Sequence, residues 1–200
     1  YTTATPEQTY YLFVRACNAY GCSQLSSSNT GYREMPVPTN VSASDGTYTN
    51  KVRVSWSSIS GATYYKIYRG TSIGGQTYLA DSSNAYYDDT SATQGRTYYY
   101  YVQALNVYGS GAQSTYNGGW RNMAVPTTFS ASDGSYSDKV YLNWTAVSGA
   151  TYYEIWRADT QGGGGSRIAA PSAPPYNDTS ALILKHYWYQ VNACNAYVCS

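Results

Sequence analysis

Hydrophobic and polar residues alternate with a period of two along much of the chain. Alternation over four to eight residues is typical of a β-strand with one buried face. Turn-forming pairs such as Asp45-Gly46 and Ser60-Gly61 separate the alternating stretches. The pattern therefore predicts short strands joined by tight turns, with these residues facing a core: Val52, Val54, Trp56, Tyr65, Ile67, Tyr98, Tyr100, Val102 and Ala104.

The pattern recurs because the sequence repeats itself. Residues 37–69 match residues 125–157 at an offset of 88, and residues 9–33 match residues 97–121 at the same offset. From Asp89 and Asp178 onward the offset is 89. This period is too long for a solenoid unit and suits a small domain with its own core. We expect a first, partial repeat in residues 1–34, a complete second repeat in 35–122, and a third repeat without its last strand in 123–200.

Two explanations of the partial outer repeats stay open. The segment is either a window of a longer array, or a chain whose N-terminal part completes the third repeat of a neighbouring copy by donor-strand exchange. Residues 1–23 duplicate what the third repeat already contains, which favours the window.

The composition argues against some classes of binding partner. Charged residues make up 12% of the chain and the net charge is +1, so we expect no binding to nucleic acid or to an anionic membrane surface. No apolar run approaches the roughly 18 residues of a membrane span. The 26 tyrosines, against two phenylalanines, favour strands and can present aromatic surface that also forms hydrogen bonds.

Three stretches of the second repeat, ASDGTYTNKVRVSW, SGATYYKIYR and QGRTYYYYVQALNVYG, resemble bacterial fibronectin type III domains. The resemblance covers essentially the whole chain. It implies an all-β fold of tandem, immunoglobulin-like β-sandwiches with seven strands per complete repeat, in a large secreted or cell-surface bacterial protein. It also places a tyrosine corner at Tyr98, with counterparts Tyr10 and Tyr187. The third repeat departs from the pattern just before Tyr187, where it reads LILKHYWY, and this puts the preceding turn in doubt.

The four cysteines behave as two pairs. ACNAYGCS at 16–23 returns as ACNAYVCS at 193–200, while the second repeat reads ALNVYGSG, so both cysteines are replaced there together. In the family's topology these segments form the turn between strands F and G, and we expect disulfides Cys17–Cys22 and Cys194–Cys199 across it. A pair of cysteines offers too few ligands for a metal site, and the spacing is not that of a redox motif. Disulfides imply an oxidising, extracellular location.

The chain supplies little catalytic chemistry. One histidine, His186, and scattered acids give no nucleophile with a base, so we expect neither an enzyme nor a cofactor. One metal hypothesis remains open: oxygen ligands in the A–B and E–F turns, which face the next repeat, could bind calcium. The alternative is that these residues are ordinary turn formers. The candidate ligands are Asp45, Asp88, Asp89, Asp133 and Asp178.

The outward side of the sheet that holds strands C, F and G should carry an aromatic stripe. Such a stripe could stack on sugar rings or pack on another copy, or it could reflect only the strand preference of aromatic residues. Its expected members are Tyr64, Tyr68, Tyr99, Tyr101, Tyr152, Trp156 and Trp188.

These observations lead to two functional hypotheses. The first is a non-enzymatic extracellular segment that acts as stalk, spacer or filament, with further repeats or neighbouring copies as partners. The alternative is an adhesive or carbohydrate-binding module that uses the stripe to bind surface glycans or serves a secreted polysaccharide-degrading enzyme.

Overall fold

The computed structural model describes residues 3–200, which form strands β1 to β18 and contain no helix. Two compact units are present. The first comprises residues up to 43 together with 53–89 and 98–119, and the second comprises 44–52, 90–97 and 120–200. The predicted all-β class is therefore confirmed, whereas the repeat boundaries inferred from the sequence stay predictions.

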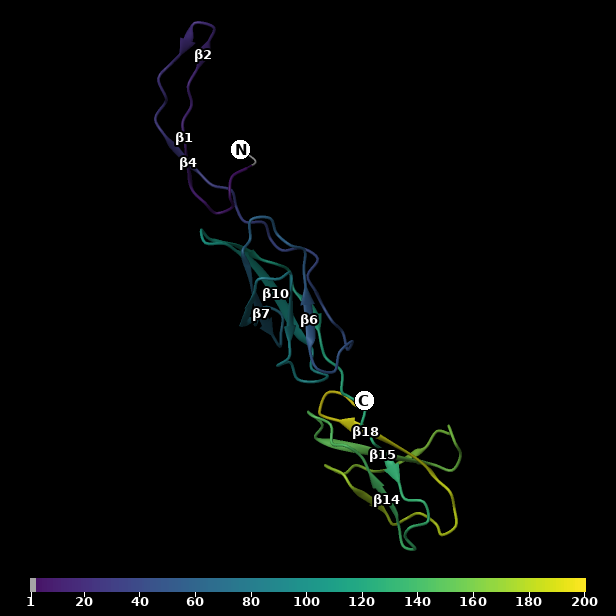
Figure 1. The fold of residues 1–200 in the computed structure, drawn as a ribbon. Helices are drawn as coiled ribbons and strands as arrows, with labels where there is room; N and C mark the ends of the chain where they lie inside the picture. The colour runs from purple at the N-terminus through teal and green to yellow at the C-terminus, as the bar shows by residue number, and fades with distance from the viewer. Residues whose placement is uncertain (1–2) are drawn as a thin grey trace. The chain divides into compact units, whose positions relative to one another are not determined.

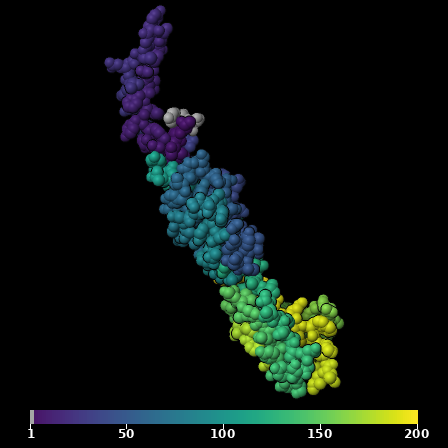
Figure 2. Space-filling model, viewed as in Figure 1, coloured from purple at the N-terminus to yellow at the C-terminus, as the bar shows by residue number. Residues whose placement is uncertain are grey.

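The N-terminal part of the first unit is a long hairpin (Figure 1, Figure 2). Strand β1 (Tyr10–Leu12) pairs antiparallel with β4 (Asn29–Gly31), and β2 (Cys17–Asn18) pairs with β3 (Gly21–Cys22) at its tip. Apolar side chains on it, including Phe13 and Val14, are exposed. A two-stranded hairpin buries too little apolar surface to form a core of its own.

The rest of the first unit contains two antiparallel sheets, seen in Figure 1 as β6 lying across from β7 and β10. One sheet has the order β5 (Ser42–Ala43), β6 (Val52–Ser55) and β9 (Tyr86–Asp89). The other has the order β11 (Ser110–Gln113), β10 (Tyr98–Leu105), β7 (Tyr64–Gly70) and β8 (Thr77–Ser82). Strand β12 (Asn117–Gly119) also pairs with β10, so β11 and β12 are two parts of one interrupted last strand.

All nine residues that the alternation predicts to face the core are buried. The rings of Trp56 and Tyr65 pack edge to face with their centroids 5.1 Å apart. The Tyr65 hydroxyl accepts a hydrogen bond of 2.8 Å from the backbone N–H of Ile59, so the polar end of this buried ring has a partner. Burial of alternate side chains follows directly from the pleat of the strands.

The second unit repeats the order β5, β6, β9 in one sheet and the order β10, β7, β8 in the other. One sheet consists of β13 (Ser130–Ala131), β14 (Val140–Asn143) and β17 (Tyr176–Asp178), and the other of β16 (Ser166–Ala169), β15 (Tyr152–Ala158) and β18 (Trp188–Cys194). The ring centroids of Trp144 and Tyr153 lie 5.2 Å apart, against 5.1 Å for Trp56 and Tyr65. The core of this unit is formed by Met123, Leu142, Trp144, Tyr153, Ile155, Val191 and Ala193.

Two tyrosine-corner hydrogen bonds are present where the resemblance places them. The Tyr10 hydroxyl accepts a bond of 3.0 Å from the N–H of Thr5, and the Tyr187 hydroxyl accepts one of 3.4 Å from the N–H of Leu182. The third predicted corner residue, Tyr98, is buried, and the guanidinium of Arg69 lies 4.5 Å from its ring centroid.

The divergent turn before Tyr187 keeps the backbone of its counterpart. Leu184 has φ 60°, close to the 74° of Gly95, one repeat earlier. Lys185 N–H donates to the Leu182 carbonyl at 3.3 Å, as Arg96 N–H does to Thr93 at the same distance. A leucine in the left-handed region costs about 1–2 kcal/mol relative to glycine, so the turn is retained here against the local preference of its residue.

Candidate functional site

Five tyrosine rings, from strands β7, β8 and β10 and from the break between β11 and β12, lie on the outward face of the sheet in the first unit. The register places Tyr101 opposite Tyr68, and Tyr68 opposite Tyr78. Their ring contacts are 6.2 Å between Tyr68 and Tyr78, 5.5 Å between Tyr99 and Tyr116, and 5.9 Å between Tyr101 and Tyr116, measured between centroids. We call Tyr68, Tyr78, Tyr99, Tyr101 and Tyr116 the tyrosine face.

The exposure of this face differs from the sequence-based expectation at Tyr101. That residue points outward as predicted but is only 7% exposed, because its ring packs against Tyr116. Its hydroxyl also accepts a hydrogen bond of 2.9 Å from the N–H of Gly74. Tyr64, expected in the stripe, is half-buried at the start of β7, opposite Leu105.

The residues that supply most of the accessible ring surface were not predicted. Tyr78 is 55% exposed and Tyr116 is 44% exposed. Tyr78 lies on β8 and Tyr116 lies in the break between β11 and β12. Polar and apolar residues alternate only weakly in edge segments of this kind. Only the pairing of these segments with the neighbouring strands would have located the two rings.

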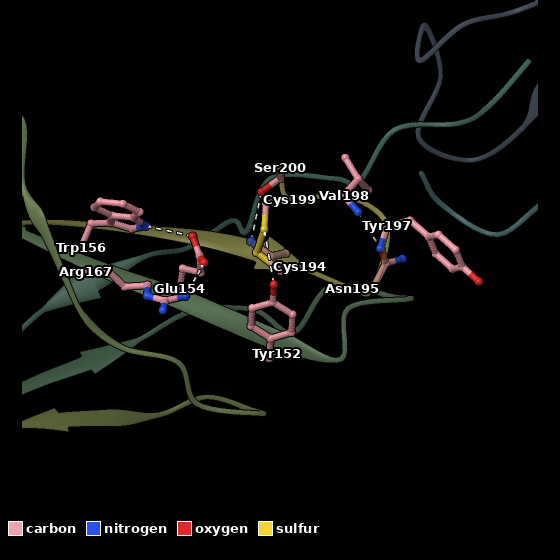
Figure 3. Close-up of a disulfide and its surroundings, with 11 residues drawn as sticks. Tyr152, Glu154, Trp156, Arg167, Cys194, Asn195, Tyr197, Val198, Cys199 and Ser200 are labelled. Carbon is pink, nitrogen blue, oxygen red and sulfur yellow. Dashed lines mark hydrogen bonds and ion pairs between the residues drawn. A yellow bond between two sulfur atoms is a disulfide. The ribbon is translucent and has the colours of Figure 1, made fainter. Parts of the chain in front are cut away.

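The equivalent face of the second unit carries two tryptophans, Trp156, which is seen in Figure 3, and Trp188. Trp156 lies on β15 opposite Gln190 of β18, and Trp188 lies opposite Ala158. Trp188 is 40% exposed. Together with Gln190 and the glycine turn at 162–165, the two indoles line a small pocket of about 20 Å³. We call Trp156, Trp188 and Gln190 the tryptophan face.

Polar groups border the tryptophan face on one side. Trp156 Nε1–H donates to a carboxylate oxygen of Glu154 at 3.3 Å, and Arg167 Nη1 donates to the other oxygen at 2.7 Å. Tyr152, a further predicted member, lies beyond Glu154, with its hydroxyl 3.9 Å from Cys199 Sγ. Stacking surface next to hydrogen-bonding groups is the arrangement that a polar ring such as a sugar needs.

Both predicted disulfides are present. Cys17 and Cys22 are direct partners across β2 and β3, and Cys194 is bonded to Cys199. In the second repeat Leu105 and Ser110 are paired at the same place. The joint replacement seen in the sequence thus reflects two residues that face each other across a turn.

An asparagine occupies the same position of this turn in all three repeats, including the second repeat, which has no disulfide. In each case the side-chain oxygen accepts two backbone N–H groups, two and three residues later, which fixes the turn. Two of these asparagines also donate from Nδ2 to a carbonyl within their own unit: Asn106 to Pro6 at 2.8 Å and Asn195 to Gln94 at 3.1 Å. The three residues are Asn18, Asn106 and Asn195.

Two of the five predicted calcium ligands are instead buried partners of arginine. Asp89, which is 0% exposed, binds Arg69 at 2.6 Å and accepts a hydrogen bond of 2.8 Å from the Tyr100 hydroxyl. Burial and the neighbouring carboxylate raise the pKa of Tyr100 well above its usual value. Asp89 therefore holds strands of the two sheets together from inside.

The second unit repeats this network one period later. Asp178 binds Arg157 at 2.8 Å and accepts from the Tyr189 hydroxyl at 2.9 Å. Burial opposes ionisation of Asp178, but hydrogen bonds from Ser180, Tyr189 and Arg157 outweigh it and lower the pKa of this carboxyl. Burial and Asp178 together raise the pKa of Tyr189.

The other three predicted calcium ligands, Asp45, Asp88 and Asp133, form no group of metal ligands with Asp89 or Asp178 among the described residues. Asp88 and Asp89 lie in strand β9 and not in the E–F turn as expected, and Asp88 is paired with Arg53 at 2.7 Å. Asp45 and Asp133 lie outside the strands, next to Gly46 and Gly134. The turn prediction failed because Asp-Asp-Thr reads as a turn former, while the arginine partners lie far away in the sequence.

Within residues 3–200, one group of three potential metal ligands comes together: Glu154, Cys194 and Cys199. Its two cysteines are joined as a disulfide, so their sulfurs are not available as thiolates. His186 is exposed beside the corner residue Tyr187. The part of the chain described here also has no helix that is long and apolar enough to span a membrane.

No protein-family model matches the chain. An amylopullulanase from Thermoanaerobacterium saccharolyticum is 30% identical over 125 residues, which make up 60% of this chain and 9% of that protein. The chain thus spans less than a tenth of that relative.

Solved structures show a likeness in fold. A segment of two fibronectin type III domains from chicken tenascin has a TM-score of 0.65, covering 82% of this chain and 94% of that chain at 14% identity. A Fn3-like protein from Clostridium thermocellum is 28% identical over 44% of this chain and 93% of its own, with a TM-score of 0.41. The likeness to the tenascin segment shows that the chain has the fold of tandem fibronectin type III domains.

Proposed function

We propose that this chain is a non-catalytic accessory segment of a secreted polysaccharide-degrading enzyme, in which fibronectin type III-like repeats act as spacers and offer aromatic faces to glycans. The observation that carries the proposal is the 125-residue similarity to an amylopullulanase. The matched residues make up 9% of that protein, as expected for an accessory segment of a larger enzyme. The two short disulfides support an extracellular location.

The spacer role is supported by repetition of the stabilising contacts. Each unit has its own tryptophan–tyrosine pair and its own buried arginine–aspartate–tyrosine network. The asparagine bonds to Pro6 and Gln94 also recur, because these two acceptors are 88 positions apart. Self-contained units that repeat the same contacts can be joined in series without losing stability.

The tryptophan face supports the glycan-binding role. Indole rings offer large, flat apolar surface for the C–H face of a sugar, while Gln190 and the Glu154–Arg167 pair can hydrogen-bond its hydroxyls. The pocket between the indoles is too small for a sugar ring, so a sugar unit of a longer chain would stack on the exposed indole surface of Trp188 and not enter the pocket. Weak single contacts on successive repeats add up through multivalency, which is how an accessory segment can hold a polymer.

Affinity electrophoresis of the chain tests this role, with gels that contain starch, pullulan, cellulose or xylan. We expect retardation by an α-glucan. Trp188→Ala should weaken binding about tenfold, because loss of a half-buried aromatic contact costs about 1.5 kcal/mol. Tyr197→Ala is the matched control, since Tyr197 is 53% exposed but lies in the clamped turn, away from the face. It should be retarded like the parent chain.

Three results would contradict the proposal. The glycan role is wrong if no polysaccharide retards the chain, or if Trp188→Ala and Tyr197→Ala move alike. The accessory role is wrong if the purified chain alone releases reducing sugar from starch or pullulan at a rate proportional to its concentration.

A further inference from the structure

Two rings of the tyrosine face lie 17 positions apart in the sequence. Tyr99 lies on β10, and Tyr116 lies directly before β12, which pairs with β10. Their centroids are 5.5 Å apart with the ring planes at 84°. Tyr116 is 44% exposed and Tyr99 is half-buried, so the pair is accessible from the solvent.

We propose that Tyr99 and Tyr116 form an oxidative cross-linking site that yields dityrosine in the presence of hydrogen peroxide and a haem peroxidase. Each phenol gives up one electron and one proton, and the two phenoxyl radicals join through a carbon–carbon bond between their ortho positions. The hydrogen on each ortho carbon then moves to the phenolic oxygen, which restores both aromatic rings. The two electrons and two protons reduce one hydrogen peroxide to two waters.

The position of this pair within the repeats supports the assignment. The first and third repeats each have a disulfide, Cys17–Cys22 and Cys194–Cys199, at the turn where the second has Leu105 and Ser110, six residues along β10 from Tyr99. A bond between Tyr99 and Tyr116 would join the same two strands in the repeat that lacks the disulfide.

The equivalent positions of the other repeats cannot form this bond. In the first repeat they are Tyr11 and Ser28, and in the third Trp188 stands where the second has Tyr99. The tyrosine pair and the cysteine pair therefore do not occur together in a described repeat.

Neighbouring rings are less suited to the reaction. Tyr101 is 5.9 Å from Tyr116, but it is buried and its hydroxyl is held by the N–H of Gly74. Tyr68 is 6.2 Å from Tyr78, and its hydroxyl donates to Gln103 at 2.8 Å. Release of the phenolic hydrogen from Tyr68 would break that bond. This inference stands apart from the glycan-binding role.

The test is oxidation of the dilute chain with horseradish peroxidase and hydrogen peroxide, followed by trypsin digestion and mass spectrometry. Cleavage after Arg96 and Arg121 places both tyrosines in the peptide 97–121. We expect this peptide to lose two hydrogen atoms in mass and to give no backbone fragments between residues 99 and 116. Tyr99→Phe and Tyr116→Phe should each abolish the product. Tyr108→Phe is the matched control, because Tyr108 is exposed in the same peptide, and it should leave the yield unchanged.

The site is wrong if the product forms equally in Tyr116→Phe, or if oxidation gives only cross-links between chains. A separate measurement, the unfolding temperature, tests whether the dityrosine bond replaces the disulfide. The oxidised monomer should unfold its second repeat at a temperature several degrees higher than the untreated chain, and oxidised Tyr116→Phe should show no such rise. An unchanged unfolding temperature in the cross-linked chain would overturn that role.

Discussion

Neighbouring aspartates on β9 provide a sharp test of how the second repeat is stabilised. Asp88 and Asp89 each pair with an arginine, at 2.7 Å and 2.6 Å. The Asp89 side chain is 0% exposed and that of Arg69 is 22% exposed, whereas those of Asp88 and Arg53 are 28% and 40% exposed. The two substitutions Asp88→Ala and Asp89→Ala therefore remove chemically identical groups from different environments.

The expected losses of unfolding free energy differ by several kcal/mol. Asp89→Ala leaves Arg69 partly buried without its partner and removes the acceptor of the Tyr100 hydroxyl. Removing one partner of a buried ion pair costs about 3–5 kcal/mol. Asp88→Ala breaks a pair that water screens, and such pairs contribute about 0–1 kcal/mol.

Urea titration read by hydrogen-exchange mass spectrometry measures the two losses, with peptides from β10 reporting on the second repeat and peptides from β18 on the third. With a urea slope of about 1–3 kcal/mol per molar, Asp89→Ala should lower the midpoint of the β10 peptides by about 1–5 M and Asp88→Ala by about 1 M or less, so that at one common slope the first shift is at least about three times the second. The β18 peptides should not move. Equal shifts for the two variants would refute the account of Asp89 as the buried anchor.

Three further predictions concern pH, the disulfides and the tyrosine hydroxyls. The lowered pKa of Asp178 adds stability at pH values above the usual aspartate pKa, so circular dichroism should show the third repeat losing stability as the pH falls below about 4. The raised pKa values of Tyr100 and Tyr189 act in the opposite range: their contribution is complete below pH about 10 and is lost as the pH rises further. Reduction of Cys194–Cys199, five residues apart, should cost about 2 kcal/mol and speed amide exchange in the turn while the sandwich stays folded, so complete unfolding would contradict the turn-clamp role. Tyr65→Phe should cost about 1–3 kcal/mol by leaving the Ile59 N–H without its acceptor, and a thermal melt within error of the parent would show that water replaces it.

Much of the fold follows from local rules that are visible in the sequence. Alternation identified the buried residues of β6, β7 and β10 because the pleat forces alternate side chains to opposite faces. Comparison of the repeats identified the disulfides, because Leu105 and Ser110 replace the cysteines only as a pair. Leu184 shows that the preference of a single residue can also mislead. Leucine disfavours the left-handed backbone of this turn, yet the φ of Leu184 is close to that of Gly95.

The features that sequence reasoning missed depend on tertiary contacts. Asp89 resembled a turn residue because Arg69 and Tyr100 are its neighbours only after the sheets assemble. Tyr78 and Tyr116 lie on edge segments whose pairing is fixed by the adjacent strands and not by their own pattern. The aromatic stripe was therefore located on the correct sheet, but its most accessible rings were not named.

The most direct test of the proposed function is an NMR titration of the chain with pullulan oligosaccharides, observing the indole Nε1–H signals. Trp156 and Trp188 lie on the outward face, while Trp56 and Trp144 are buried in the two cores and serve as internal controls. The account predicts saturable shifts of the Trp156 and Trp188 signals with the core signals unchanged. Unchanged Trp156 and Trp188 signals at millimolar oligosaccharide would contradict it, and so would equal movement of all four.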